Sequence, residues 1–437
     1  MDTNYHKKAA LDIYSEALKA VDPHRLTFHF SEKVRSLYQD SGAERLIVTG
    51  FGKAAITMGK AAEDSLYDII TEGILITKHG HRKKNLLFRK LKVFEAGHPI
   101  PDENGLTGTG EVIRLMHAAD ENTLVLCLIS GGGSALLVSP YEGITLADKQ
   151  NITDLLLKAG AIINELNTLR KHISKVKGGR LAEIAHPANV ISLIISDVIG
   201  DRLDVIASGP TSPDDTTFQD ALRVIEKYEL MDQTPPPVLT VLRKGADGLI
   251  PETPKEGSYI FDRVENMIIG NNKKALEAAK AKADSFGLDA EIISAEMTGE
   301  AREVGKWLAQ KAIKIKNSGG LKRSCCLISG GETTVTVKGN GLGGRNMELA
   351  LAFAMEIDGI DGITLLSAGT DGTDGPTDAA GAILDGKTIE KGRRLGLDPQ
   401  EYLNNNDSYH FFERINDLLL TGPTGTNVMD IQIIICG

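Results

Sequence analysis

Two basic residues stand in glycine-rich turns, where they could hold the oxygens of a phosphate or a carboxylate. Lys53 follows Gly50 and Gly52, and Arg345 lies in the run 339–346, which contains four glycines. Glycine lets the backbone approach a ligand closely, and a helix starting after this run would add its positive dipole end. Lysine supplies a point charge and arginine a bidentate pair. These residues indicate an anionic ligand; a flexible turn with a solvated cation is the alternative.

A further anion cradle is expected after the apolar run 124–129. This turn consists of Ser130, Gly131, Gly132, Gly133 and Ser134. Its successive N–H groups would form a nest for an anion. Ser134 is not a hydrolase nucleophile by pattern, because Leu136 stands where Gly-x-Ser-x-Gly needs its second glycine. We therefore interpret Ser130 and Ser134 as hydroxyl donors.

Carboxylates follow two other apolar runs. Asp197 comes just after the run 190–195, and Asp371, Asp374 and Asp378 lie in a Thr- and Gly-rich loop after the run 363–367. An aspartate just past a buried strand is placed for a metal ion or for general base catalysis, with a helix N-cap as the alternative. Three carboxylates in one loop need a cation or a polar ligand nearby, although their spacing is not that of an EF-hand.

A basic segment in this acidic protein is a third feature. It is predicted to be a helix that ends at Gly178 and Gly179, and it carries Asn167, Arg170, Lys171, His172 and Lys177. Such a density of cations suggests a helix end that faces an anion. A solvated cationic face at a helix C-terminus is an equally good interpretation.

The elements that position these residues alternate along the chain. Short apolar runs such as 46–48, 124–129, 190–195 and 431–436 predict buried strands, and helical patterns such as 273–286 and 300–314 lie between other runs. This alternation is typical of an α/β fold, in which ligands bind beyond the carboxyl ends of parallel strands. The hexapeptide at 127–132 occurs again at 326–331. The dinucleotide fingerprint is incomplete after Gly52, and no Walker A loop is present.

Length and composition limit the classes of protein that remain. A chain of 437 residues predicts two domains. The most linker-like region is the proline run 235–237 with the stretch 245–257, so we predict domains at 1–245 and 246–437. A formal net charge of −10 argues against general nucleic-acid binding. No stretch approaches transmembrane length, and four cysteines without metal-ligand spacing indicate reduced core residues in a cytoplasmic protein.

The order of these loops resembles that of the class II glycerate kinases, and the C-terminal portion resembles the MOFRL domain of that family. The matching segments are 52–55, 97–99, 130–134, 170–179, 196–198, 208–211, 343–346, 369–378 and 421–427. Phe51 departs from the family, where a smaller residue is usual. The resemblance implies a Rossmann-like N-terminal domain with a doubly wound, mostly parallel sheet, a MOFRL-type α/β domain and an active site in the cleft between them.

The resemblance also implies an activity. It is the Mg²⁺-dependent transfer of phosphate from ATP to the 2-hydroxyl of D-glycerate, with 2-phosphoglycerate and ADP as products. Phosphoryl transfer needs cations, backbone cradles and carboxylates for Mg²⁺, and the chain supplies all three. We expect a monomer or homodimer that binds no nucleic acid and no membrane.

The expected roles of individual residues follow from this activity. Lys53 and Arg345 would neutralise the transferring phosphoryl group or the glycerate carboxylate, and Asp197 would orient or deprotonate the acceptor hydroxyl or bind Mg²⁺. The substrate would be bound by Ser130, Gly131, Gly132, Gly133, Ser134 and Arg170. The nucleotide would be bound by Gly343, Gly344, Asn346, Asp371, Thr424 and Asn427. The remaining Mg²⁺ ligands would be Asp371, Asp374 and Asp378.

Two other classes of function fit parts of the pattern. An NAD(P)H-dependent hydroxypyruvate reductase would use similar small substrates, but the incomplete glycine fingerprint and the absence of a well-placed acidic residue for a ribose argue against it. A non-catalytic protein that binds a hydroxy acid would account for two domains. It gives no reason for so many carboxylates beside anion-binding loops.

Overall fold

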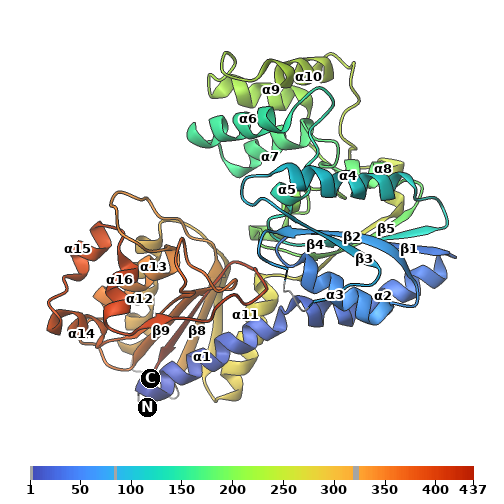
Figure 1. Cartoon of the computed structure of the whole chain (residues 1–437). Coiled ribbons are helices and arrows are strands. Elements are labelled where there is room, and N and C mark those ends of the chain that lie inside the picture. The colour runs from blue at the N-terminus through green and yellow to red at the C-terminus, as the bar shows by residue number, and fades with distance from the viewer. Residues whose placement is uncertain (1–2, 83–85, 318–323) are drawn as a thin grey trace. The chain divides into compact units, whose positions relative to one another are not determined.

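The computed structural model describes residues 3–82, 86–317 and 324–437 and divides the chain into two compact units. The N-terminal unit is Pro23–Ile269, and the C-terminal unit combines Met1–Asp22 with Gly270–Gly437 (Figure 1). This division differs from the expected boundary at 245 in two respects. The first 22 residues belong to the C-terminal unit, and residues 246–269 stay with the N-terminal unit because they lead into its sixth strand.

The N-terminal unit is built on a six-stranded sheet with the order β3-β2-β1-β4-β5-β6. Its strands are β1 (Arg45–Phe51), β2 (Ile70–Lys78), β3 (Leu91–Ala96), β4 (Thr123–Ile129), β5 (Asn189–Ile195) and β6 (Val264–Gly270). The pairs from β3 to β5 are parallel. This is the expected doubly wound order, and it reverses between β1 and β4. A ligand crevice is expected at that point, beyond the carboxyl ends of the two strands.

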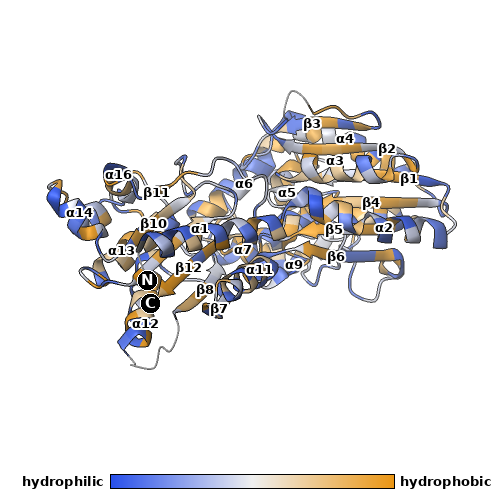
Figure 2. Cartoon of the chain, turned by 90° about the horizontal axis from the view of Figure 1, so that it is seen from below, coloured by the Kyte–Doolittle hydropathy of each residue, from blue (hydrophilic) through white to orange (hydrophobic). Residues whose placement is uncertain are grey.

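Helices cover both faces of this sheet. One face is covered by α2 (Pro23–Asp40) and α3 (Ala55–Leu66), and the other by α4 (Glu103–His117) and α8 (Arg180–Ala185) (Figure 1). The strands are apolar along nearly their whole length because both faces are buried. In Figure 2 this appears as orange ribbon along β4 and β5.

A second cluster of helices in the same unit has its own apolar core. Its members are α6 (Leu146–Lys158), α7 (Ile163–His172), α9 (Phe218–Lys227) and α10 (Pro236–Ala246), which lie together in Figure 1. The proline run that predicted a linker instead starts α10, because proline fits the first turn of a helix, where its missing N–H is not needed. Helix α7 ends at His172, not at Gly178, so Lys177 lies beyond it.

The C-terminal unit contains a mixed six-stranded sheet with the order β11-β10-β9-β12-β8-β7. Its strands are β7 (Asp289–Met297), β8 (Cys325–Gly331), β9 (Ile363–Gly369), β10 (Gly381–Asp385), β11 (Leu418–Leu419) and β12 (Asp430–Cys436). Strand β12 runs antiparallel to both of its neighbours. Helices α1 (Thr3–Ala20) and α11 (Asn272–Ser285) pack on one face, and α12 (Ala301–Asn317) and α13 (Arg345–Glu356) on the other. Among the described helices, none is long and apolar enough to span a bilayer.

Candidate active site

The turns after β1 and β4 are bound to each other at the switch point of the N-terminal sheet. The Lys53 N–H donates to the carbonyl oxygen of Gly131 (2.8 Å), and the Ala54 N–H donates to Ser130 Oγ (3.1 Å). Ser130 is buried. Its hydroxyl oxygen therefore holds the backbone at the start of α3, and this bond fixes the turn that carries Lys53.

The glycines of the 130–134 turn allow Asp197 and His98 to come close. A Cβ on Gly131 would lie 2.1 Å from Asp197 Oδ2, and a Cβ on Gly132 would lie 2.9 Å from His98 Cδ2. Gly132 also has a positive φ of 85° and lies beside Lys53. A side chain at Gly131 would displace Asp197, and at Gly132 the positive φ also favours glycine. The structure thus brings three predicted site features together, namely Lys53, the serine and glycine turn and Asp197.

A cavity of about 680 Å³ opens next to this turn. Its polar lining includes His98, Ser134, Lys149 and Arg170, and its apolar lining includes Ile100 and Leu157. Burial and the charge of Lys53 lower the pKa of His98 to about 4, so the imidazole is neutral at pH 7. Burial and the charge of Arg170 lower the pKa of Lys149 to about 7. The cavity therefore has the basic side chains of Lys149 and Arg170 in its lining, which suit an anionic ligand.

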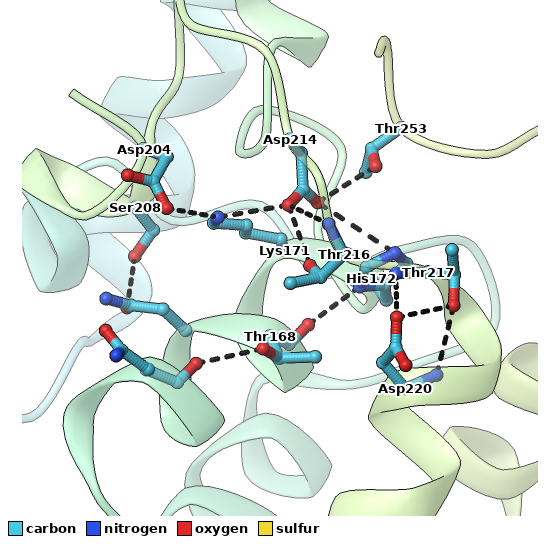
Figure 3. A network of polar contacts seen from close by, with 12 residues as sticks. Thr168, Lys171, His172, Asp204, Ser208, Asp214, Thr216, Thr217, Asp220 and Thr253 are labelled. Atoms are coloured by element: carbon cyan, nitrogen blue, oxygen red, sulfur yellow. Dashed lines mark hydrogen bonds and ion pairs between the residues drawn. The ribbon is translucent and has the colours of Figure 1, made fainter. Parts of the chain in front are cut away.

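A polar network supports the helix that carries Arg170 (Figure 3). On α7, Lys171 Nζ lies 3.1 Å from Asp214 Oδ1 and 3.4 Å from Asp204 Oδ2. Ser208 Oγ donates to the Asn167 side chain (3.0 Å) and lies 2.9 Å from Ser134 Oγ. Burial acts to raise the pKa of Asp214. The charge of Lys171 and the hydrogen bond from Thr216 nevertheless hold this pKa below its ordinary value. These bonds connect α7 to the 130–134 turn.

Arg345 is the first residue of α13 in the C-terminal unit and is bound by two carboxylates. Its guanidinium donates to Asp430 (2.6 and 3.0 Å) and to Glu332 (2.6 Å). Asp430 is buried at the start of β12. Burial opposes the charge of Arg345, but Asp430 and Glu332 together raise its pKa.

Asp374 caps the N-terminus of α13. It accepts hydrogen bonds from the backbone N–H groups of Asn346 (3.0 Å) and Met347 (2.8 Å). A Cβ on Gly344 would lie 2.3 Å from Asp374 Cγ, so that glycine makes room for the carboxylate. Burial and the charge of Asp430 raise the pKa of Asp374 to about 7, despite the two backbone bonds. The anion expected at this helix end is thus a side chain of the protein itself.

The first half of the glycine-rich loop is bound to the segment 405–408. The N–H groups of residues 338–342 donate to the side chains of Asn405, Asn406 and Asp407 or to a carbonyl oxygen of the same segment. Beyond them, a Cβ on Gly343 would lie 2.5 Å from Ser408 Oγ. Gly339 and Gly341 therefore allow close packing within the protein, where the sequence suggested an approach to a ligand.

The remaining predicted residues of this unit have varied surroundings. Asp371 accepts from Thr373, and Asp378 accepts from Tyr409 (2.8 Å). Thr424 donates its N–H to the carbonyl oxygen of Asp371, and Asn427 accepts from the N–H of Met429. Within the described ranges, no three His, Cys, Asp or Glu side chains form a preformed metal site.

Three residues in these sites were not predicted from the sequence. Asp430 and Glu332 bind Arg345, and Lys149 lines the cavity. Asp430 begins the last strand, so the rule that singled out Asp197, a carboxylate just past the end of a strand, does not find it; it lies at the carboxyl ends of β8 and β9 because β12 runs antiparallel to both. Lys149 lies within an amphipathic helix and had no such signal.

The N-terminal unit has a doubly wound sheet with candidate anion-binding turns at its switch point, and the C-terminal unit holds Arg345 on the buried Asp430. These features define the class as two-unit α/β proteins. Two family models match the chain. One, described as "Domain of unknown function (DUF4147)", matches residues 9–243, and the MOFRL family model matches residues 325–430.

Named relatives and a crystal structure match almost the whole chain. A D-glycerate 2-kinase from Thermotoga maritima is 47% identical over 98% of this chain and 97% of its own. A glycerate 2-kinase from Pyrococcus horikoshii is 42% identical over 98% and 97%. The crystal structure of a glycerate kinase from Thermotoga maritima matches with a TM-score of 0.90 and 46% identity, covering 99% of this chain and 100% of that one. The chain belongs to the glycerate 2-kinase family, with a DUF4147 N-terminal domain and a MOFRL region.

Proposed function

We propose that the protein is a D-glycerate 2-kinase, which transfers the γ-phosphoryl group of ATP to the 2-hydroxyl of D-glycerate. The observation that carries this function is the meeting of Lys53, the 130–134 turn and Asp197 at the switch point of the sheet. The relationship to the glycerate 2-kinase family supports the same reaction. ATP is the co-substrate of such a kinase.

Lys53 and the 130–134 turn bind and orient the reactants. The backbone of Lys53 is fixed by Gly131 and the following N–H by Ser130, so its side chain starts from a rigid turn. A cation held in this way stabilises negative charge that develops during transfer, because it needs no reorganisation. The glycines of the turn let substrate oxygens approach the backbone N–H groups.

Asp197 accepts the proton of the acceptor hydroxyl. As the 2-hydroxyl oxygen of D-glycerate bonds to the γ-phosphorus, the bond from that phosphorus to the bridging oxygen of ATP breaks. The hydroxyl proton passes to an Asp197 oxygen, and ADP leaves with the electron pair of the broken bond. Coordination of Mg²⁺ is the rival role for Asp197.

Asp371 fits the role of a Mg²⁺ ligand better than Asp374 does, and Asp378 remains a further candidate. Burial raises the pKa of Asp430, and the charge of Asp371 acts in the same direction. A divalent cation would reduce this repulsion, whereas the carboxylate of Asp374 is buried as the cap of α13. Mg²⁺ is commonly bound by one or two carboxylates together with the phosphates of a nucleotide. When bound, it would neutralise charge on those phosphates.

The C-terminal unit contributes Arg345 to the same reaction. We place the nucleotide contacts at Arg345, Gly343, Gly344 and the loops that carry Asp371, Thr424 and Asn427. The N–H groups of Asn346 and Met347 already bind Asp374, so the contribution of Asn346 is to hold that carboxylate and Ser367 in place. The protein acts as a monomer or homodimer, which light scattering of the purified chain would distinguish.

ADP release by the purified protein tests this function. D-Glycerate with ATP and Mg²⁺ should give ADP in a coupled assay, and the rate should fall to background without D-glycerate or with EDTA. A parallel assay with hydroxypyruvate and NADH tests the reductase. NADH consumption together with no ADP release would replace the kinase, and tight binding of D-glycerate without either activity would leave a binding protein.

A further inference from the structure

Lys149 differs from the other buried lysines of the N-terminal unit. Among the described residues of this unit, three lysine side chains are almost fully buried, namely those of Lys149, Lys171 and Lys177. Lys171 pairs with Asp214, and Lys177 donates to the carbonyl oxygen of Ala207 (3.2 Å). Lys149 is 4% exposed, and its Nζ has no hydrogen-bond partner among the residues that the structure describes. A buried ammonium group without a partner is costly, so it needs a reason.

The surroundings of Lys149 add to this cost. Arg170 lines the same cavity from α7. Burial lowers the pKa of Lys177, and the charges of Lys149 and Arg170 act in the same direction, so these cations lie near one another. The other titratable groups at the cavity are His98, which is neutral, and Asp154, which pairs with Lys158 at 2.7 Å. The cationic end of the cavity therefore lacks a described carboxylate that balances it. An anion from outside the chain would satisfy both Lys149 and Arg170.

The position of Lys149 suits one end of a small hydroxy acid. The cavity that it lines also reaches Gly132 and Ser134, and this turn is in contact with Asp197 at Gly131. Helix α6 is held at this place because Gln150 Nε2 donates to the carbonyl oxygen of Pro101 (2.7 Å). In a 2-hydroxy acid, the carboxylate and the reacting hydroxyl are on adjacent carbons. An acceptor whose carboxylate binds Lys149 and Arg170 would therefore have its hydroxyl on the side of the 130–134 turn.

We propose that Lys149 and Arg170 form the binding site for the carboxylate of the acceptor. This proposal rests on the proposed kinase function and adds to it the subsite that selects a carboxylate-bearing alcohol. The site favours acceptors that carry a carboxylate. An alcohol without one would leave the Lys149 and Arg170 side chains without an anionic partner, and this lowers its affinity.

Replacing Lys149 with methionine tests the site. The methionine side chain fills similar space without a charge, so the variant should melt no lower than the wild type. At pH 7 its KM for D-glycerate should rise about 10- to 100-fold, the loss expected for a charge-assisted hydrogen bond, while its KM for ATP stays within about twofold. Lys33→Met is the control, because Lys33 is an exposed lysine of the same unit, on α2, that does not line the cavity. Its two KM values should equal those of the wild type.

The pH dependence gives a second readout that a purely structural role would not produce. Because the pKa of Lys149 in the free protein is about 7, bound carboxylate should draw a proton onto it. Calorimetry with D-glycerate in two buffers of different ionisation enthalpy should show proton uptake near pH 7.5 in the wild type. Above pH 7, KM for D-glycerate should rise by up to about tenfold per pH unit. Neither effect should occur in Lys149→Met.

The outcomes separate the two proposals. If the wild type binds D-glycerate and Lys149→Met binds it equally well, the carboxylate site is wrong and the kinase function stands. If KM for ATP rises in place of KM for D-glycerate, the two cations bind a nucleotide phosphate and the proposal is overturned. If the wild type neither binds D-glycerate nor releases ADP with it, the kinase function fails and the acceptor site fails with it.

Discussion

Arg345 is bound on two sides by carboxylates of its own unit. Its guanidinium donates to both oxygens of Asp430 and to Glu332, and Asp430 is buried. These bonds hold the arginine in one orientation, which favours stabilisation of a developing charge. They also make the Arg345–Asp430 pair part of the stability of the C-terminal unit, so activity and stability have to be separated by experiment.

Replacing Arg345 with alanine should lower kcat about 10²- to 10³-fold, the range for removal of one preorganised donor. The same change leaves Asp430 buried without its cation, which costs about 3–5 kcal/mol of unfolding free energy. The double variant Arg345→Ala with Asp430→Asn removes that charge. We expect it to recover most of the stability in urea unfolding and none of the kcat. Equal stability of the single and double variants, or full activity in either, would contradict this assignment.

At the scale of elements, the N-terminus of α13 depends on a carboxylate from a different loop. Asp374 accepts from two backbone N–H groups at the helix start, where four such groups lack partners within a helix. Loss of a capping side chain costs about 1–2 kcal/mol. Because Arg345 is the first residue of α13, the cap also fixes the position of its backbone.

The stabilisation from Asp374 should depend on pH. Burial and the charge of Asp430 raise its pKa in the folded protein to about 7, against an ordinary value of 3.8. The folded protein therefore holds this proton more tightly than the unfolded chain does. The contribution is complete below about pH 4 and is lost as the pH rises to about 7.

Urea unfolding of wild type and Asp374→Ala between pH 4 and pH 8 measures this contribution. The difference in unfolding free energy should fall as the pH rises, with a slope of up to about 1.4 kcal/mol per pH unit. Asp378→Ala is the control, because it loses only the bond with Tyr409. It should retain the pH dependence of the wild type. A difference that does not change with pH would mean that Asp374 is ionised throughout.

The strands were easier to predict from the sequence than the structure of the segments that follow them. The apolar runs predicted most strands because both faces of these sheets are buried. The hexapeptide at 127–132 and 326–331 shows the limit. In the first copy Ser130 and the glycines leave β4 and form the turn, whereas in the second they remain in β8 and pair with β12. Which outcome occurs depends on the partner strand, which the hexapeptide does not encode.

The candidate site was predictable where residues follow a strand in one sheet. Lys53, the 130–134 turn and Asp197 follow three strands whose carboxyl ends share an edge, so α/β topology alone brings them together. Lys149 lies within a helix of the separate helical cluster. Its importance comes from burial without a partner, and burial of one lysine among exposed ones cannot be read from helical spacing.

At the scale of the whole molecule, the first helix belongs to the C-terminal unit although nearly 250 residues separate them. Lys7 pairs with Asp385 (3.1 Å) and Asp417 (3.2 Å), and the Tyr14 hydroxyl donates to the carbonyl oxygen of Gly369 (2.7 Å). The apolar side of α1 is buried. Gly369 ends β9 and precedes the loop of Asp371, so α1 supports the acidic loop directly.

Fragments of the chain test this division. Residues 23–269 should unfold cooperatively on their own in urea, because they contain a complete sheet and both of its helical layers. Residues 270–437 should lack a cooperative transition, since removal of α1 exposes one face of their sheet. Adding a peptide of residues 1–22 should restore the transition. A cooperative transition of residues 270–437 without the peptide would contradict the role of α1.

The most direct test of the kinase function is the identity of the product. Phosphorus NMR of wild type with D-glycerate, ATP and Mg²⁺ should show 2-phosphoglycerate and ADP in equal amounts, and Lys53→Ala should reduce the rate about 10²- to 10³-fold. Lys60→Ala, on the exposed side of α3, is the control and should keep the wild-type rate. A 3-phosphoglycerate signal, or no phosphorylated product while hydroxypyruvate oxidises NADH, would contradict the account.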